Sequence, residues 1–133
     1  MKRYFYIVAT FAATILAAPS VSAADWQCRN ADVEISCEDG KCAVAPSHTP
    51  MSTTIALTGG AEICSYSGCW KTSAPNLVIE DGYLLLTSSD FSWSGSGDVQ
   101  QTTNGAISLD ISKLVATVMI GGFAHPMTCT KSQ

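Results

Sequence analysis

The chain has 133 residues, of which 47% are hydrophobic and 14% charged, with six cysteines and a formal net charge of −4 at pH 7. Its size is typical of one domain with a modest core. Phosphate binding needs clustered lysine and arginine, whereas the few basic residues here are scattered. The composition therefore argues against nucleic acid as a partner.

The first 23 residues have the pattern of a cleaved secretory signal peptide. Lys2 and Arg3 give a charged start, residues 7–18 are apolar, and Val-Ser-Ala at 21–23 is a small-residue cleavage sequence. The apolar run is shorter than the roughly 20 residues of a spanning helix. We therefore predict a mature chain, residues 24–133, that forms a single β domain without a transmembrane segment. Its five basic and eleven acidic residues give it a net charge of −6.

All six cysteines lie in the mature chain, and an even number behind an export signal predicts disulfides and a periplasmic or secreted location. Two pairs share a C-x4-C spacing around turn-forming residues. If each set of four intervening residues is a hairpin loop, the flanking cysteines become cross-strand neighbours within bridging distance. The other two cysteines then pair by elimination. The predicted disulfides are Cys37–Cys42, Cys64–Cys69 and Cys28–Cys129.

Metal ligation is the alternative use of the two C-x4-C pairs. The spacing is not the C-x2-C of zinc ribbons, and no histidine lies close to either pair in the sequence. Disulfides are therefore favoured, and neither a metal nor a cofactor is predicted.

The hydrophobic period of the first half of the mature chain is two, which predicts strands rather than helices. Two prolines deny backbone donors to the loop at 46–50, and Gly59-Gly60 ends a later strand. The strands predicted in this half are 33–37, 41–45, 53–57 and 61–66.

The second half carries the clearer turn signals. Asp81-Gly82 lies between two apolar runs, which is a strong hairpin signal. Gly95-Ser96-Gly97, Asn104-Gly105 and Gly121-Gly122 are further predicted turns or connections. Pro126 is expected at an edge or bulge because it has no backbone donor. The strands predicted here are 77–80, 83–87, 91–94, 107–112, 114–120 and 123–130.

Short strands at regular spacing, with turns of Gly, Asn and Asp, indicate an all-β fold. We predict a small antiparallel β-sandwich or barrel of about eight strands, stapled by disulfides.

Catalytic motifs are missing from the sequence. It contains no G-x-S-x-G elbow, no S-x-x-K, no H-E-x-x-H and no phosphate or calcium loop. A binding module is therefore favoured over an enzyme. The alternative is a small secreted hydrolase that uses His48 and His125, or a pair of carboxylates. The carboxylate candidates are Glu62, Glu80, Asp81, Asp90 and Asp98.

Aromatic side chains are the better candidates for binding a ligand or partner. If they face outward, they can stack on sugar rings or anchor a protein. If they face inward, they are part of the hydrophobic core. The inward orientation is favoured for Phe91 and Trp93. Tyr66 stands at the tip of the second C-x4-C turn, where a disulfide would hold it rigidly. The predicted binding residues are Tyr66, Trp70, Phe91 and Trp93.

An apolar ligand inside a barrel is a third possibility. Residues 84–86 and 114–120 are apolar on both faces, so one face could pack the core while the other lines a cavity. A second packed sheet explains the same pattern without a ligand. The predicted partner is therefore a protein, a glycan or an apolar molecule.

Ser94-Gly95, together with the export signal, acidic charge and disulfides, is similar to features of small periplasmic lysozyme inhibitors, which are compact β-barrels. The tyrosine that follows the Ser-Gly motif in that family is missing here, and the cysteine pattern differs. The resemblance therefore assigns no inhibitory residue. A basic lysozyme would suit the −6 charge, and unchanged cell-wall lysis at excess protein would exclude inhibition.

Overall fold

The structure is a computed structural model that describes residues 25–132 apart from 31, 59 and 98–100. The predicted signal peptide lies outside the described residues. In the described part the regular elements are strands, and it holds no helix long and apolar enough to cross a membrane. The strands are β1 (Trp26–Arg29), β2 (Ile35–Glu38), β3 (Lys41–Val44), β4 (Ser52–Ala56), β5 (Gly60–Ser65), β6 (Gly68–Thr72), β7 (Asn76–Glu80), β8 (Tyr83–Gly95), β9 (Thr102–Asp110), β10 (Val115–Ile120) and β11 (Phe123–Lys131).

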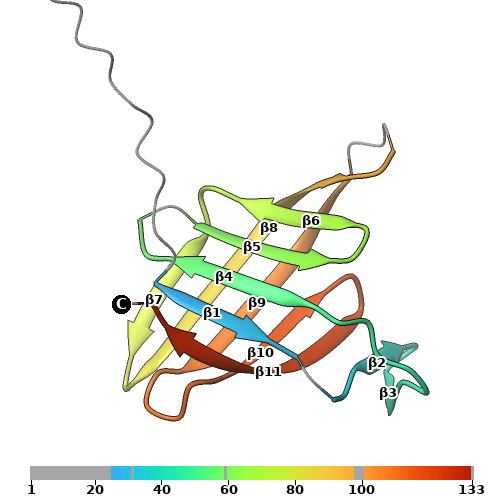
Figure 1. The fold of residues 1–133 in the computed structure, drawn as a ribbon, viewed down its shortest axis with the longest axis horizontal. Helices are drawn as coiled ribbons and strands as arrows, with labels where there is room; N and C mark the ends of the chain where they lie inside the picture. Colours follow the sequence, from blue (N-terminus) through green and yellow to red (C-terminus); the bar gives the residue numbers. More distant parts are fainter. Residues whose placement is uncertain (1–24, 31, 59, 98–100, 133) are drawn as a thin grey trace, which may run out of the picture.

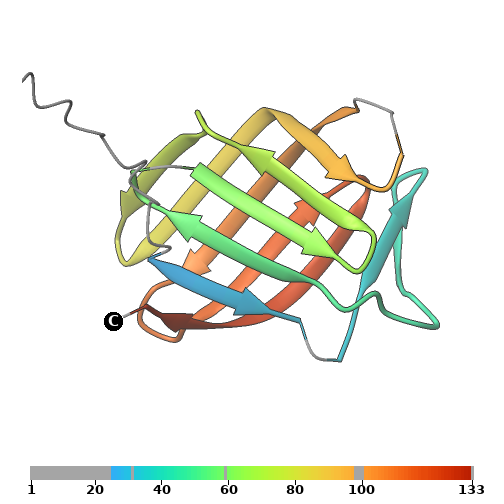
Figure 2. The same cartoon turned by 45° about the horizontal axis from the view of Figure 1, so that its top comes forward.

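Eight of the strands form a closed antiparallel barrel (Figure 1). Their order around it is β1-β4-β5-β6-β8-β9-β10-β11, and β11 pairs with β1 to close the ring. The hairpin β2–β3 joins the start of β11, while β7 pairs with the first half of β8. Figure 2 shows the hairpin standing beside one end of the barrel. The prediction of an all-β sandwich or barrel is confirmed, and the barrel is the form adopted.

The barrel forms because each strand alternates between its interior and its outer face. In β10, for example, Ala116, Val118 and Ile120 are buried, whereas Val115 and Met119 are exposed. Adding such strands around a ring gives one apolar interior without a second sheet. The side chains that fill it most completely include Ile55, Ile63, Leu84, Leu86, Phe91, Ile107, Leu109 and Val118.

All three predicted disulfides are present. The Cys28–Cys129 bridge joins β1 to β11 at the seam where the barrel closes, and these cysteines are register partners. The two C-x4-C pairs bridge hairpins, but the connecting turns are shorter than predicted. Glu38 pairs with Lys41, and Ser65 with Gly68, so each loop has two residues instead of four. The strands therefore continue one residue beyond each bridge.

The Asn104-Gly105 turn prediction is wrong, because both residues lie inside β9. A Cβ atom on Gly105 would come within 2.6 Å of Phe91 Cε2, so the glycine provides space for a buried ring. An Asn-Gly pair usually marks a hairpin turn, but here the glycine is needed because a larger residue would clash with the Phe91 ring.

Strand β8 also differs from the prediction of two separate strands at 83–87 and 91–94. It runs unbroken for 13 residues and shifts register between Ser88 and Phe91. A bulge bends a strand without ending it. At this point the Ser88 hydroxyl forms hydrogen bonds with the Asp90 carboxylate and the Thr72 hydroxyl, which fix the bend. Strand β1 was not predicted, because four residues give too short a pattern.

Pro126 occupies a local edge within β11, as predicted. On one side it faces Thr117 of β10. On the other side, β11 pairs with β2 at residues 123–124 and with β1 at residues 128–131. Pro126 falls between these two ladders, where a missing backbone donor costs least.

The two ends of the described chain meet at the end of the barrel farthest from the β5–β6 hairpin. The Ser132 amide donates to the carbonyl oxygen of Asp25, at 3.0 Å. Figure 1 shows the start of β1 and the end of β11 side by side there.

Candidate functional site

A cavity of about 500 Å³ opens at the opposite end of the barrel, which we call the mouth. The β5–β6 and β10–β11 hairpins and the far end of β8 reach this end (Figure 2). Its lining combines aromatic, aliphatic and polar side chains. The lining residues are Glu34, Thr49, Met51, Ser65, Ser67, Trp70, Trp93, Gln101, Ile120, Gly121, Phe123 and His125.

Two tryptophans form the aromatic wall of the mouth. Trp70 of β6 and Trp93 of β8 are register partners, with ring centroids 5.0 Å apart and planes tilted by 55°. Both are partly exposed, and Trp70 packs against the core beneath. They belong to the interior-facing set, but they lie where the barrel opens and so retain accessible surface.

Paired glycines make room for the Trp93 indole. Gly68 and Gly95 lie opposite one another on β6 and β8. A Cβ atom on either one would come within 2.7 Å of Trp93 Cζ2. The ring is therefore held close against bare backbone, in an orientation that larger residues would prevent.

A buried polar pair lies on the cavity wall. His125 of β11 is 2% exposed and Glu34, just before β2, is 7% exposed. Glu34 Oε2 lies 3.6 Å from His125 Nδ1 and accepts a hydrogen bond from the Thr49 amide at 3.2 Å. The Glu34 carbonyl accepts from the Ala45 amide, which ties this segment to the end of β3. The ring of His125 stacks on that of Phe123 at the rim.

Burial sets the charge of this pair. Loss of hydration lowers the pKa of His125 below 6.5, and the opposing effect of the Glu34 carboxylate is smaller. The imidazole is therefore neutral at pH 7. The 3.6 Å separation exceeds hydrogen-bond length, and Nδ1 has no partner in the described structure, so the contact is not an ion pair at this pH.

The structure brings together three of the residues singled out in the sequence, Trp70, Trp93 and His125. Tyr66 is 89% exposed at the tip of the β5–β6 hairpin, between two serines that line the mouth. Phe91 is fully buried in the core and does not line the cavity. Neither does His48, which lies half-buried in the loop before β4.

The carboxylates considered for a hydrolase do not assemble at the mouth. Among the four within the described residues, Glu62 pairs with Lys71 at 3.2 Å on the outer face, and Asp90 belongs to the β8 bulge. Glu80 and Asp81 are at the β7–β8 turn. Asp98 lies outside the described residues.

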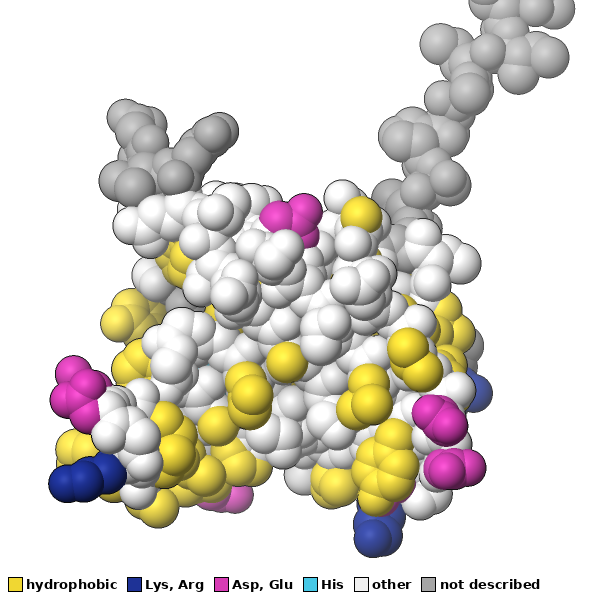
Figure 3. Space-filling model, turned by 180° about the vertical axis from the view of Figure 1, so that it is seen from behind, with side chains coloured by type: hydrophobic (Ala, Val, Ile, Leu, Met, Phe, Trp, Pro, Cys, Tyr) yellow, Lys and Arg dark blue, Asp and Glu magenta, His cyan; other side chains and the backbone are white. Residues whose placement is uncertain are grey.

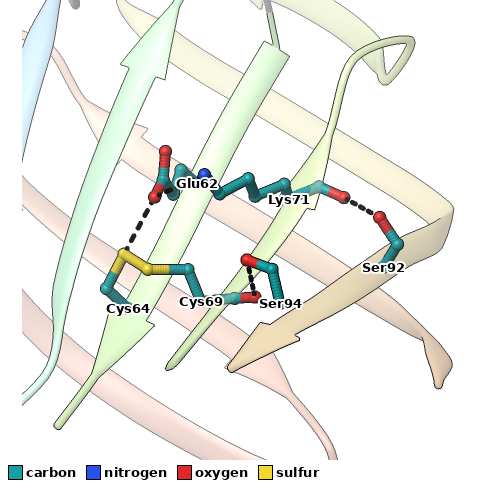
Figure 4. Close-up of polar contacts among 6 residues, drawn as sticks. All are labelled: Glu62, Cys64, Cys69, Lys71, Ser92 and Ser94. Atoms are coloured by element: carbon teal, nitrogen blue, oxygen red, sulfur yellow. Dashed lines mark hydrogen bonds and ion pairs between the residues drawn. A yellow bond between two sulfur atoms is a disulfide. The ribbon is translucent and has the colours of Figure 1, made fainter. Parts of the chain in front are cut away.

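The outer face of β5 and β6 carries the second disulfide (Figure 4). Glu62 Oε1 lies 3.2 Å from Cys64 Sγ, but a disulfide sulfur carries no proton, so this is a contact without a donor. Glu62, Cys64 and Cys69 are grouped closely enough for a metal. Because both sulfurs are consumed by the bridge, they are not thiolate ligands.

Sequence reasoning missed Glu34 and the rim residue Phe123. In the sequence, Glu34 occupies a polar position of an apparently half-exposed strand, and such a position normally indicates a solvent-exposed side chain. Only the β2–β3 hairpin, which pairs with β11 through Ile35 and Ser36, brings Glu34 to His125. No local signal in the sequence could have identified that contact.

The back of the barrel is a weaker candidate for recognition. Exposed apolar side chains of β7, β8 and β10 include Val78, Leu85, Val115 and Met119. Figure 3 shows the apolar side chains of this face in groups separated by polar surface. It therefore lacks the continuous apolar area expected of a docking face.

Comparison with protein-family models, curated proteins and solved structures finds no match to this chain. Its function is therefore inferred from the site itself.

Proposed function

We propose that this protein is an exported, disulfide-stabilised binding module that holds a small ligand in the mouth of its barrel. The observation that carries the proposal is the placement of Trp70, Trp93, Glu34 and His125 around one cavity. Its volume of about 500 Å³ falls in the range of small-molecule sites, which combine apolar walls with a few polar groups.

The three disulfides indicate an oxidising environment. Together with the predicted signal peptide, they support action in a periplasm or outside the cell.

The lining suits a molecule with a flat or apolar body. The tryptophan faces provide stacking area for a sugar ring or an aromatic ring. Glu34 and Gln101 provide polar atoms that orient the ligand. Much of the deeper interior is already filled by fully buried side chains such as Leu84 and Leu86, so the ligand would occupy the mouth.

Binding is favoured over hydrolysis by the surroundings of His125. Its Nδ1 atom faces Glu34 and has no hydrogen bond. The hydroxyls of the lining residues Ser65 and Ser67 hydrogen-bond one another at 3.1 Å. A histidine-dependent hydrolase would need a nucleophile activated by the imidazole, and neither hydroxyl is held in that way.

The experiment is a titration followed by tryptophan fluorescence, with a panel of methyl glycosides, fatty acids and small aromatic molecules. Saturable quenching by at least one of them is expected, because two of the three tryptophans border the cavity. Trp93→Leu should weaken that binding about tenfold, by loss of stacking. Thermal unfolding of the variant shows whether the barrel survives the change.

Tyr66→Ala is the matched control, since Tyr66 is aromatic and close to the mouth but does not line it. This variant should keep the affinity. If Tyr66→Ala weakened binding and Trp93→Leu did not, the binding site would lie at the hairpin tip, and a protein partner would be favoured over a small ligand.

A further inference from the structure

The mouth carries an unbalanced charge. Among the lining residues that the structure describes, Glu34 is the one with a carboxyl group, His125 is neutral, and none is a lysine or an arginine. Glu34 is nine-tenths buried and receives one backbone hydrogen bond, from Thr49. A buried carboxylate normally requires a cationic partner or several donors. Within the described residues, its neighbours do not supply a positive charge at pH 7.

The aromatic wall favours the same sign of ligand charge. The faces of tryptophan rings attract ammonium and guanidinium groups through their negative electrostatic potential. Trp70 and Trp93 expose part of their surface in the cavity that Glu34 also lines. A cation entering it therefore meets two independent attractive groups, whereas a carboxylate or phosphate meets repulsion from Glu34.

The remaining lining is apolar and accepts a hydrocarbon body. Met51, Ile120 and Phe123 lie around the cavity, and Met51 packs onto the core. Neutral sugars would satisfy the polar groups but leave the Glu34 charge uncompensated. From these observations we infer that the ligand of the barrel mouth is a protonated amine carried on an apolar or aromatic body, an inference that rests on the proposed binding function.

The test compares three probes with one ring and different charges, namely 2-phenylethylammonium, 2-phenylethanol and 3-phenylpropionate. Affinities are measured at pH 7.5 and low salt by fluorescence and calorimetry. The ammonium probe should bind about tenfold more tightly than the alcohol, the gain of one charge-assisted hydrogen bond. The carboxylate probe should bind more weakly than the alcohol.

Glu34→Gln should bring the ratio of ammonium to alcohol dissociation constants close to one, while its side-chain oxygen can still accept from the Thr49 amide. Glu62→Gln makes the same change on the outer face and should leave the ratio as it is, because Glu62 does not line the mouth. If Glu34→Gln does not fold, Ser67→Lys serves instead. It places a cation at the rim and should weaken the ammonium probe selectively.

The outcomes separate the two proposals. Equal affinity for the ammonium and alcohol probes, or a ratio unchanged by Glu34→Gln or Ser67→Lys, overturns the cation inference while the mouth remains a binding site. Saturable binding of glycosides or fatty acids, without binding of the ammonium probe, has the same meaning. If neither these probes nor the wider panel binds, both proposals are overturned.

Discussion

At the scale of single residues, the main chemical feature is a histidine that burial keeps neutral. His125 is in contact with Glu34 and Phe123, and Glu34 is the titratable group that faces it among the described residues. Its pKa in the folded protein is below 6.5, whereas the unfolded chain has the ordinary value of about 6.5. As the pH falls through about 6.5, the unfolded chain takes up the proton first.

The free energy of unfolding should therefore be independent of His125 above this pH and should fall below it. The slope for one proton is at most about 1.4 kcal/mol per pH unit. Urea unfolding between pH 7.5 and 5 measures it. His125→Gln should flatten this part of the profile, whereas His48→Gln should retain it. A steeper loss of stability in acid for His125→Gln than for the wild type would contradict the assignment.

At the scale of elements, β8 and β9 show how one side chain shapes two strands. The ring of Phe91 is fully buried and lies against Gly105 on the neighbouring strand. The β8 bulge precedes Phe91. After it, the pairing of β8 with β9 resumes with Thr103 opposite Phe91. The small residue on β9 and the register shift on β8 thus accommodate the same ring.

Gly105→Ala should reduce the free energy of unfolding by about 1–3 kcal/mol, because the added methyl group overpacks the core against Phe91. Denaturant unfolding provides the measurement. In the double variant Gly105→Ala, Phe91→Leu, the smaller side chain removes the clash. Its loss of stability should therefore be less than the sum of the two single losses. A strictly additive result would show that the ring and the glycine are not coupled.

The elements that could be predicted from the sequence are those specified locally. Asp81-Gly82 gives a hairpin because its turn and strand register depend on residues that are close in the sequence. The same holds for the two C-x4-C segments, where the disulfide is local as well. The candidate site was only partly predictable. The alternation around Trp93 placed it on one face but did not say that this face lies at an opening, and the contact between Glu34 and His125 depends on how β2 joins β11.

At the scale of the whole molecule, one disulfide has a different role from the other two. The Cys28–Cys129 bridge spans 101 residues and joins the strands that close the barrel. Cys37–Cys42 spans five residues within one hairpin. In the chain-entropy description, a bridge stabilises by restricting the unfolded chain, and the restriction grows with the loop it closes.

Replacing Cys28 and Cys129 with alanine should cost about 4.7 kcal/mol of unfolding free energy, against about 2 kcal/mol for the same change at Cys37 and Cys42. Denaturant unfolding of the two double variants compares the losses directly. Equal losses would mean that closing the longer loop adds no extra stability, and would contradict the chain-entropy description of this bridge.

The positions of Asp25 and Ser132 decide how the barrel can be attached to something else. Ser132 and Asp25 are hydrogen-bonded at the end of the barrel away from the mouth. A tether attached to the barrel beside Asp25 or Ser132 therefore leaves the cavity facing away from the attachment point. Immobilised on a sensor surface or fused to another protein at this side, the barrel would present its opening to the surrounding solution.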